Sequence, residues 1–298
     1  MEPAVRLAEL TDPAFVASVR QLRLVARSVP AGGRFADQRS AEKGSGLEFI
    51  DHRGYAPGDD LRKVDWNLYK RLGKVFVRQF EEPLDLPVYL VPDTSMSSFQ
   101  GDNPRARAAV FAAAALASMA LGQHDQVAVM PLAEDLEIAL RPTSGSGKLM
   151  QVLRLLSELQ PAGGTDLRTG LARLSQQRLR RGLVVLISDL FDPAGAEAVT
   201  EALAGLRHRV LIVQLARSTD REPGLSGEAR LVDCEGGGTA EVAITPALLG
   251  RYRDAYDRFQ EHIASFASGR GMGLVRLDAD QPVVPQLAAH FQGGRLVV

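Results

Sequence analysis

The chain has a single cysteine among its 298 residues, Cys234. One thiol cannot form an internal disulfide, so the sequence excludes a small secreted scaffold that depends on disulfide bonds for stability. Scarce cysteine is also typical of proteins in a reducing compartment, and we therefore expect a cytoplasmic protein. Cys234 lies in a polar, glycine-rich stretch with no identifiable base beside it, which does not support a nucleophilic role.

Net charge and long hydrophobic runs are also scarce. The 35 basic and 36 acidic residues leave a formal charge of −1 at pH 7, without the positive excess with which a dedicated nucleic-acid binder neutralises phosphates. The longest uncharged apolar stretch, residues 108–121, is shorter than the roughly 20 residues that cross a bilayer. We therefore expect neither a nucleic-acid partner nor insertion into a membrane.

Two further kinds of site find no support in the residue pattern. The five histidines, at positions 52, 124, 208, 262 and 290, show neither the paired spacing nor the clustering at strand ends that a zinc site uses. The stretch Ser144–Lys148 resembles a phosphate-binding loop, but Pro142 and Leu149 replace the glycine and the hydroxyl residue of that motif. The sequence therefore predicts neither zinc nor nucleotide binding.

What the sequence does contain, from Pro83 onward, is an alternation of short apolar runs with longer amphipathic stretches. Uninterrupted apolar strands indicate burial on both faces of a sheet, and helical crossovers make the sheet mostly parallel. We predict a three-layer α/β sandwich over residues 83–298, preceded by a small N-terminal module over residues 1–82. The expected strands are residues 88–91, 126–132, 137–140, 183–188, 210–215 and 273–277, and the expected helices are residues 105–121, 148–159, 167–180, 195–206 and 246–269.

The N-terminal module has a pattern of its own. Apolar residues at helical spacing predict a helix over residues 12–28, and the small polar residues 30–46 predict a loop. Residues 47–55 and 75–80 are expected to form strands on either side of a short helical turn over residues 60–69.

Polar side chains follow the first predicted strand of the sandwich at alternate positions. Asp93, Ser95 and Ser97 come directly after this apolar run, and loops at the carboxyl ends of parallel strands commonly carry function. A tight loop can turn all three side chains inward, and oxygen ligands of low total charge suit a hard cation such as Mg²⁺. The alternative is that these side chains only cap the next helix.

Two more loops supply hard oxygen atoms. Thr165 and Asp166 follow a Gly-Gly pair, and Asp189 follows another predicted strand, with Asp192 as an alternative three residues on. Taken singly, each of these side chains is explained as well by helix capping. Taken together, the three loops favour a metal site.

This arrangement resembles the metal-ion-dependent adhesion site of von Willebrand factor A domains. The upstream residues 44–49, 53–62 and 65–66 resemble the longer signature of the bacterial domain-of-unknown-function family numbered 58. The resemblance implies a von Willebrand factor A-like fold and a Mg²⁺, Mn²⁺ or Ca²⁺ ion. Its candidate ligands, directly or through water, are Asp93, Ser95, Ser97, Thr165 and Asp189. The resemblance also implies an open coordination position for a partner's carboxylate, and partnership with a MoxR-type AAA+ ATPase.

Four further residues are candidate partner contacts. Arg62 and Lys63 belong to a basic stretch, residues 61–80, that suits an acidic partner, although a solvated face explains it as well. Trp66 offers a large apolar anchor, either for a partner or for packing of the N-terminal module onto the sheet. Asp166 is the fourth candidate partner contact. Its alternative role is to lie in the outer shell of the metal site or to cap the next helix.

The sequence as a whole predicts a non-enzymatic, Mg²⁺-dependent, chaperone-like adaptor that binds a carboxylate of a client protein. With the ATPase, it would act in protein remodelling or complex maturation. A metal-dependent phosphoester hydrolase, with Asp93 or Asp166 as base, is the alternative enzyme class, but no histidine, lysine or second carboxylate cluster is placed to complete its acid and base roles. A structural domain with an inactive metal site is the third class.

Overall fold

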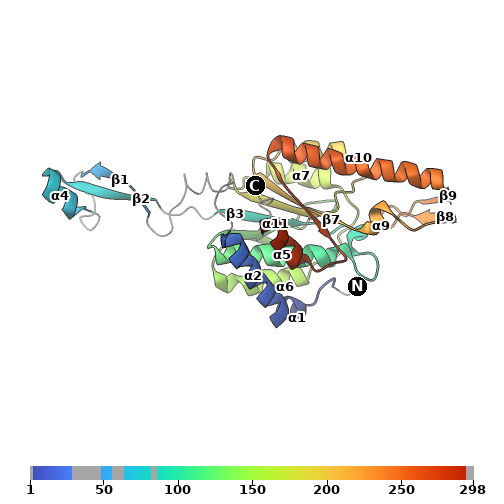
Figure 1. The fold of residues 1–298 in the computed structure, drawn as a ribbon, viewed down its shortest axis with the longest axis horizontal. Coiled ribbons are helices and arrows are strands. Elements are labelled where there is room, and N and C mark those ends of the chain that lie inside the picture. The colour runs from blue at the N-terminus through green and yellow to red at the C-terminus, as the bar shows by residue number, and fades with distance from the viewer. Residues whose placement is uncertain (1–2, 29–47, 56–63, 82–85, 293–298) are drawn as a thin grey trace. The chain divides into compact units, whose positions relative to one another are not determined.

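A computed structural model describes residues 3–28, 48–55, 64–81 and 86–292 of the chain (Figure 1). The chain forms two compact units, one made of Met1–Pro30 together with Leu86–Val298 and the other of Ala31–Asp85. The loop expected over residues 30–46 lies outside the described residues.

A six-stranded sheet lies at the centre of the larger unit, in the order β10-β7-β6-β3-β4-β5. Every neighbouring pair is parallel except β4 and β5. The strands β3 and β6 are adjacent and almost completely buried, as their uninterrupted apolar sequences require. The six strands are β3 (Pro87–Pro92), β4 (Gln126–Val129), β5 (Leu140–Thr143), β6 (Leu183–Ser188), β7 (Arg209–Ala216) and β10 (Gly273–Asp278).

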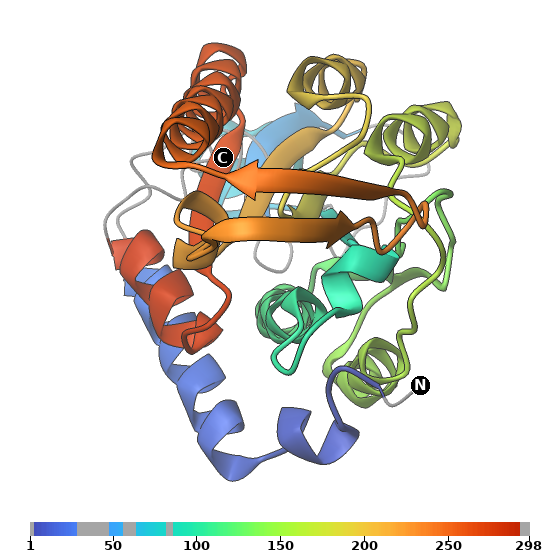
Figure 2. The ribbon, with the colours of Figure 1, turned by 90° about the vertical axis from the view of Figure 1, so that its right-hand side faces the viewer.

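Helices cover both faces of this sheet, which confirms the predicted three-layer α/β sandwich (Figure 2). Tyr89, Leu186 and Ile212 of the sheet pack with Leu171 and Leu203 of the helices in one buried cluster. One face carries α7 (Leu167–Gln176), α8 (Ala196–Ala204) and α10 (Pro246–Arg270), and the other carries α1 (Leu7–Leu10), α2 (Pro13–Ser28), α5 (Arg105–Gly122), α6 (Leu149–Ser157) and α11 (Val283–Gln292).

Helix α5 is the central helix of the second face. Its alanines Ala112 to Ala115 are fully buried, because small side chains let the helix lie close to the sheet and to its neighbours. Within the described part of the chain, α5 is the one helix long and apolar enough to cross a membrane by length and composition. Of that 18-residue stretch, 72% is buried inside the structure, as in the core helix of a folded domain.

The structure contains elements that the sequence pattern did not predict. An antiparallel hairpin, β8 (Gly227–Val232) with β9 (Thr239–Ile244), follows the short helix α9 (Ser218–Arg221). Most hairpin residues are exposed, so the apolar alternation that marks a half-buried strand is weak. The strand predicted over residues 137–140 begins only at Leu140, because an isolated bridge between Leu132 and Leu136 first turns the chain back.

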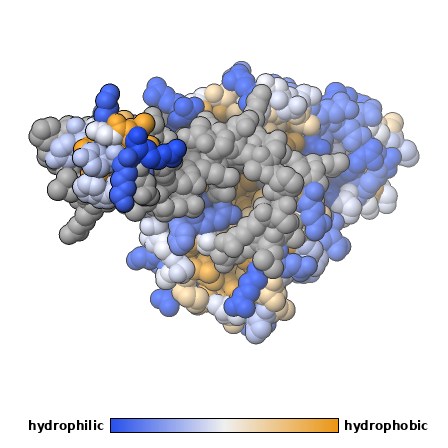
Figure 3. All heavy atoms as spheres, turned by 60° about the vertical axis from the view of Figure 1, so that its left-hand side comes forward, coloured by the Kyte–Doolittle hydropathy of each residue, from blue (hydrophilic) through white to orange (hydrophobic). Residues whose placement is uncertain are grey.

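The smaller unit is built on an antiparallel pair, β1 (Glu48–Gly54) and β2 (Phe76–Glu81), which confirms the two strands predicted there. Helix α4 (Trp66–Leu72) lies between them in sequence, later than the predicted turn of residues 60–69, part of which is outside the described residues. Trp66, Tyr69 and Leu72 of α4 are exposed by 56%, 43% and 58%. Figure 3 shows hydrophobic and hydrophilic side chains next to each other on this unit.

The division between the units differs from the boundary predicted at residue 82. Helix α2 belongs to the larger unit, where it packs on α11 and α5. Val19 and Leu22 of its apolar face are buried, and the rings of Phe15 and Phe111 meet edge to face at 5.2 Å. The helical spacing predicted which face of α2 is apolar, but not which surface it covers.

A close backbone approach next to β6 yields a testable prediction. A Cβ atom at Gly182 would lie 2.1 Å from the carbonyl oxygen of Pro87, the first residue of β3. We expect Gly182→Ala to push the two central strands apart and to lower the free energy of unfolding by about 1–3 kcal/mol, measured by urea denaturation.

The matched control is Gly250→Ala in α10, where a Cβ atom would meet nothing within 4 Å. Alanine is favoured over glycine inside a helix, so this variant should gain about 0.5–1 kcal/mol. Equal stability changes in the two variants would contradict the role given to Gly182.

Candidate metal centre

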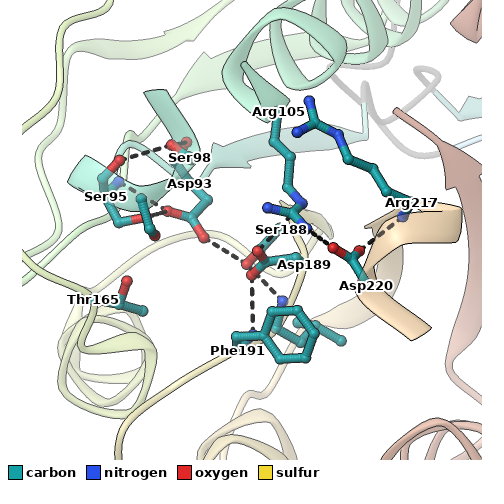
Figure 4. A network of polar contacts seen from close by, with 12 residues as sticks. Asp93, Ser95, Ser98, Arg105, Thr165, Ser188, Asp189, Phe191, Arg217 and Asp220 are labelled. Carbon is teal, nitrogen blue, oxygen red and sulfur yellow. Dashed lines mark hydrogen bonds and ion pairs between the residues drawn. The ribbon is translucent and has the colours of Figure 1, made fainter. Parts of the chain in front are cut away.

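The loop after β3 is arranged around one buried carboxylate (Figure 4). The residue Asp93 is 4% exposed and Ser95 is fully buried. Oδ1 of Asp93 accepts hydrogen bonds from the backbone nitrogen of Ser95 at 2.9 Å and from its hydroxyl at 2.6 Å. The Ser95 hydroxyl also lies 3.2 Å from that of Ser97. The structure therefore brings the three residues of the predicted motif together.

Backbone hydrogen bonds fix this loop against its neighbours. The nitrogen of Met96 donates to the carbonyl of Gly163 at 2.8 Å, and that of Ala162 donates to the carbonyl of Thr94 at 2.9 Å. The Ser98 hydroxyl donates to the carbonyl of Ser95 at 2.8 Å, at the start of the short 3-10 helix η2 (Met96–Phe99). The loop before α7, which carries Thr165, is therefore held beside the loop after β3.

The end of β6 supplies a residue that the sequence did not single out. The hydroxyl of Ser188 donates to Oδ2 of Asp93 at 2.6 Å and accepts from the nitrogen of Leu190 at 2.9 Å. Leu190 is fully buried and has a φ of 66°, a left-handed conformation that leucine rarely adopts. Strain of this kind often occurs at functional sites, and here it lies directly after Asp189.

Asp189 is the carboxylate of this loop that lies near Asp93. Its side chain is 11% exposed, and its Oδ2 lies 3.5 Å from Nε of Arg105, which also pairs with Asp220 of α9. Burial, and then the charge of Asp93, raise the pKa of Asp189 to about 7, although Arg105 opposes this change. Burial also raises the pKa of Asp93, against the lowering effect of its hydrogen bonds from Ser188 and Ser95.

The two other acids considered from the sequence have capping contacts. Asp192 accepts from the backbone nitrogens of Leu167 and Ala194, both at 2.7 Å. Asp166 is the N-cap residue of α7 and accepts from the nitrogen of Thr169 at 2.8 Å. These contacts favour Asp189 over Asp192 as the acid of the site, and they match the capping alternative for Asp166.

Thr165 joins the site through a second residue that was not predicted, Glu235. This glutamate lies in the turn between β8 and β9, and its Oε1 accepts from the Thr165 hydroxyl at 2.7 Å and from the nitrogen of Ser97 at 3.2 Å. Its Oε2 accepts from the nitrogen of Thr165 at 2.7 Å. Partial burial raises the pKa of Glu235, but the hydrogen bonds from Ser97 and Thr165 outweigh it and leave this pKa below its usual value.

The donor set fits a hard divalent cation. The charge of Glu235 raises the pKa of Asp93, and that of Asp93 raises the pKa of Asp189, so nearby carboxylates repel one another. Within the described ranges, no three histidine, cysteine, aspartate or glutamate side chains are grouped to hold a metal by themselves. A cation here would also need hydroxyl oxygens, and Mg²⁺ accepts such an oxygen-only set.

The remaining candidates are Trp66, Arg62 and Lys63. Trp66 is the first residue of α4 in the smaller unit, with its ring edge to face against Tyr69 at 6.2 Å. Arg62 and Lys63 lie outside the described residues.

Two residues of the candidate site that the sequence did not identify, Ser188 and Arg105, have sequence features that could have marked them. Ser188 is the polar end of an apolar strand, and Arg105 is a charged residue at the start of a mostly apolar helix. Glu235 has no such sequence feature, since it is one of several polar residues in a mostly exposed turn.

The hydrogen bond between Ser188 and Asp93 can be tested by substitution. We expect Ser188→Ala, in buffer free of divalent cations, to lower the free energy of unfolding by about 1–3 kcal/mol, because a buried carboxylate loses a donor. Urea unfolding followed by circular dichroism measures the change.

Ser175→Ala is the matched control, since the exposed Ser175 hydroxyl donates only to the carbonyl of Ala172 within the same helix. Its effect should stay within about 0.5 kcal/mol. A loss at Ser188 no larger than that at Ser175 would show that Asp93 does not depend on this hydroxyl.

Comparisons with known proteins place the chain in a family. It is 29% identical over 285 residues to an uncharacterized protein of Mycobacterium tuberculosis, covering 94% of this chain and 89% of the relative. Among solved structures it is similar to BatB from Bacteroides thetaiotaomicron, with 17% identity, 70% of this chain and 98% of that chain covered, and a TM-score of 0.41. It is also similar to the SpRpn10 VWA domain, with 11% identity, 68% and 94% covered, and a TM-score of 0.38. The family profile described as "Protein of unknown function DUF58" matches residues 51–262, and the chain belongs to this family.

Proposed function

We propose that this protein is a non-enzymatic adaptor that binds a carboxylate of a partner protein through a Mg²⁺ ion. The observation that carries the proposal is the convergence of oxygen donors from separate loops. Asp93, Ser95 and Ser97 follow β3, Thr165 precedes α7, and Asp189 follows β6. Hydroxyls and carboxylates that meet at the carboxyl ends of parallel strands are suited to a hard cation with an open coordination position.

The chain's own residues would hold and orient this ion. Asp93, Ser95, Ser97, Thr165 and Asp189 are the proposed ligands, directly or through water. When bound, the ion would supply a positive charge that attracts a carboxylate. Ser188 fixes the orientation of the Asp93 carboxylate, and Arg105 contacts Asp189 from the side of α5. The burial of Asp93 and Ser95 keeps bulk water away from this side of the site.

The contacts of the two candidate bases favour an adaptor over a phosphoester hydrolase. A general base needs a free lone pair within reach of its proton donor. Both oxygens of Asp93 already accept hydrogen bonds from serine hydroxyls, and Asp166 caps α7. These contacts give both carboxylates a structural role, which favours the adaptor.

The partners follow from the family resemblance. We propose that the protein is cytoplasmic, that a MoxR-type AAA+ ATPase is one partner, and that a client presenting an aspartate or glutamate is the other. The ATPase would couple nucleotide hydrolysis to remodelling or maturation of the client. Mn²⁺ or Ca²⁺ would serve in place of Mg²⁺ if their larger size is accommodated.

Titration with Mn²⁺, followed by electron paramagnetic resonance and calorimetry, tests the metal site. We expect wild-type protein to bind one ion and the double variant Ser95→Ala/Ser97→Ala to bind it at least about tenfold more weakly, because two hydroxyl donors are lost. The matched control is Ser144→Ala/Ser146→Ala, which removes two exposed serines at the same spacing. Equal Mn²⁺ binding by all three proteins would contradict the proposed ligands.

Affinity capture with and without chelator tests the partner proposal. We expect a client protein to be captured in Mg²⁺ by the wild type, and to be lost on chelation or in the Ser95→Ala/Ser97→Ala variant. Capture of a AAA+ ATPase would support the partnership. Mg²⁺-dependent hydrolysis of a phosphoester, abolished by Asp93→Ala, would replace the adaptor with an enzyme.

A further inference from the structure

The β8–β9 hairpin contacts the candidate metal centre through Glu235. Glu235 reaches a hydroxyl and two backbone nitrogens that belong to the loops of this centre. We infer that Glu235 is an intramolecular ligand of the site, which keeps it closed to partner carboxylates until the hairpin is displaced. This inference rests on the proposed function, because it assigns a regulator to the same site.

Glu235 places a carboxylate directly on residues of the proposed site. Its two oxygens receive three hydrogen bonds, two from Thr165 and one from Ser97, and both residues are proposed ligands. The glutamate is 138 residues from Ser97 and 70 from Thr165 in sequence, so chain connectivity does not force this contact. A side chain from elsewhere in the fold thus contacts two of the proposed ligands.

The carboxylates gathered here favour a cation at the site. Glu235 holds its carboxylate against Thr165 and the backbone nitrogen of Ser97, in the loops beside the buried Asp93. In the part of the chain that the structure describes, no lysine or arginine forms an ion pair with Glu235. Like charges gathered in a partly buried site repel strongly, and a divalent cation between them reverses this repulsion.

The turn that carries Glu235 is ordered locally. The carboxylate of Asp233 accepts from the nitrogen of Glu235 at 2.9 Å, and the nitrogen of Asp233 donates to the carbonyl of Gly238 at 2.8 Å. Gly237 has a φ of 67°, which glycine adopts without strain. These contacts hold the turn in shape independently of the metal centre, so it can leave the site as one piece.

The hairpin is also weakly attached to the rest of the unit. Its two strands pair only with each other, as a separate two-stranded sheet, and most of their residues are exposed. In Figure 2 the hairpin lies in front of the central sheet. A two-stranded hairpin buries little apolar surface, so its displacement costs little free energy beyond the contacts of Glu235.

Water-proton relaxation of Mn²⁺-loaded, full-length protein tests the inference. We expect Glu235→Ala to carry about one more exchangeable water on the ion than wild type, because a carboxylate ligand is lost. Acetate should remove this water in Glu235→Ala while leaving wild type unchanged at the same concentration. The matched control is Glu228→Ala, which removes an exposed carboxylate from the same hairpin and should behave as wild type.

Hydrogen exchange gives a second readout that does not need the ion. The backbone amides of Ser97 and Thr165 donate to Glu235, so they should exchange at least tenfold faster in Glu235→Ala than in wild type or Glu228→Ala. Faster exchange at these two amides, with the rest of the unit unchanged, also shows that the variant is folded.

The outcomes separate this inference from the proposed function. If wild type and Glu235→Ala bind Mn²⁺ with the same number of exchangeable waters and respond alike to acetate, the inference is overturned and the metal site stands. If neither protein binds Mn²⁺, the proposed function fails, and the inference fails with it. Unchanged exchange of the Ser97 and Thr165 amides overturns the contact itself.

Discussion

The candidate metal centre depends on the buried carboxylate of Asp93. Burying a charged group is costly unless hydrogen bonds replace its hydration, and here Ser95 and Ser188 supply three of them. Ser95 follows β3 and Ser188 ends β6, so one carboxylate joins the ends of two neighbouring strands. The sheet order makes this possible, because parallel neighbours end at the same edge.

Much of the fold and part of the site could be predicted from the sequence, because both depend on local patterns. Apolar runs locate β3 and β6, and the polar residues directly after them lie at the site, as Asp93 and Asp189 do. Contacts between distant elements leave no such pattern. The spacing of Val19 and Leu22 predicts an apolar face but not its position against α5 and α11. Glu235 was missed because its exposed strands have no strong periodicity and its partners are remote in sequence.

The site is also connected to the segment that carries the hairpin. Arg105, the first residue of α5, contacts both Asp189 and Asp220, and Asp220 lies in α9 just before β8. The Tyr252 hydroxyl of α10 donates to the carbonyl of Asp220 at 2.5 Å. The segment between β7 and α10 is thus fixed at its start, α9, to the helix α5 that also contacts the site. Glu235 holds the far end of this segment, the turn between β8 and β9. A fixed start and a far end held by Glu235 would let the hairpin move, as we infer, without disturbing the sheet.

The tether of Glu235 has a consequence for selectivity. A carboxylate attached to the same chain competes at an effective concentration on the order of millimolar, whatever the amount of protein present. Small carboxylates that circulate in a cell below that level would be outcompeted, although they carry the same chemical group. Only a binder that contacts additional surface could add enough free energy to win. The hairpin would therefore act as a filter that rejects metabolites and admits macromolecules.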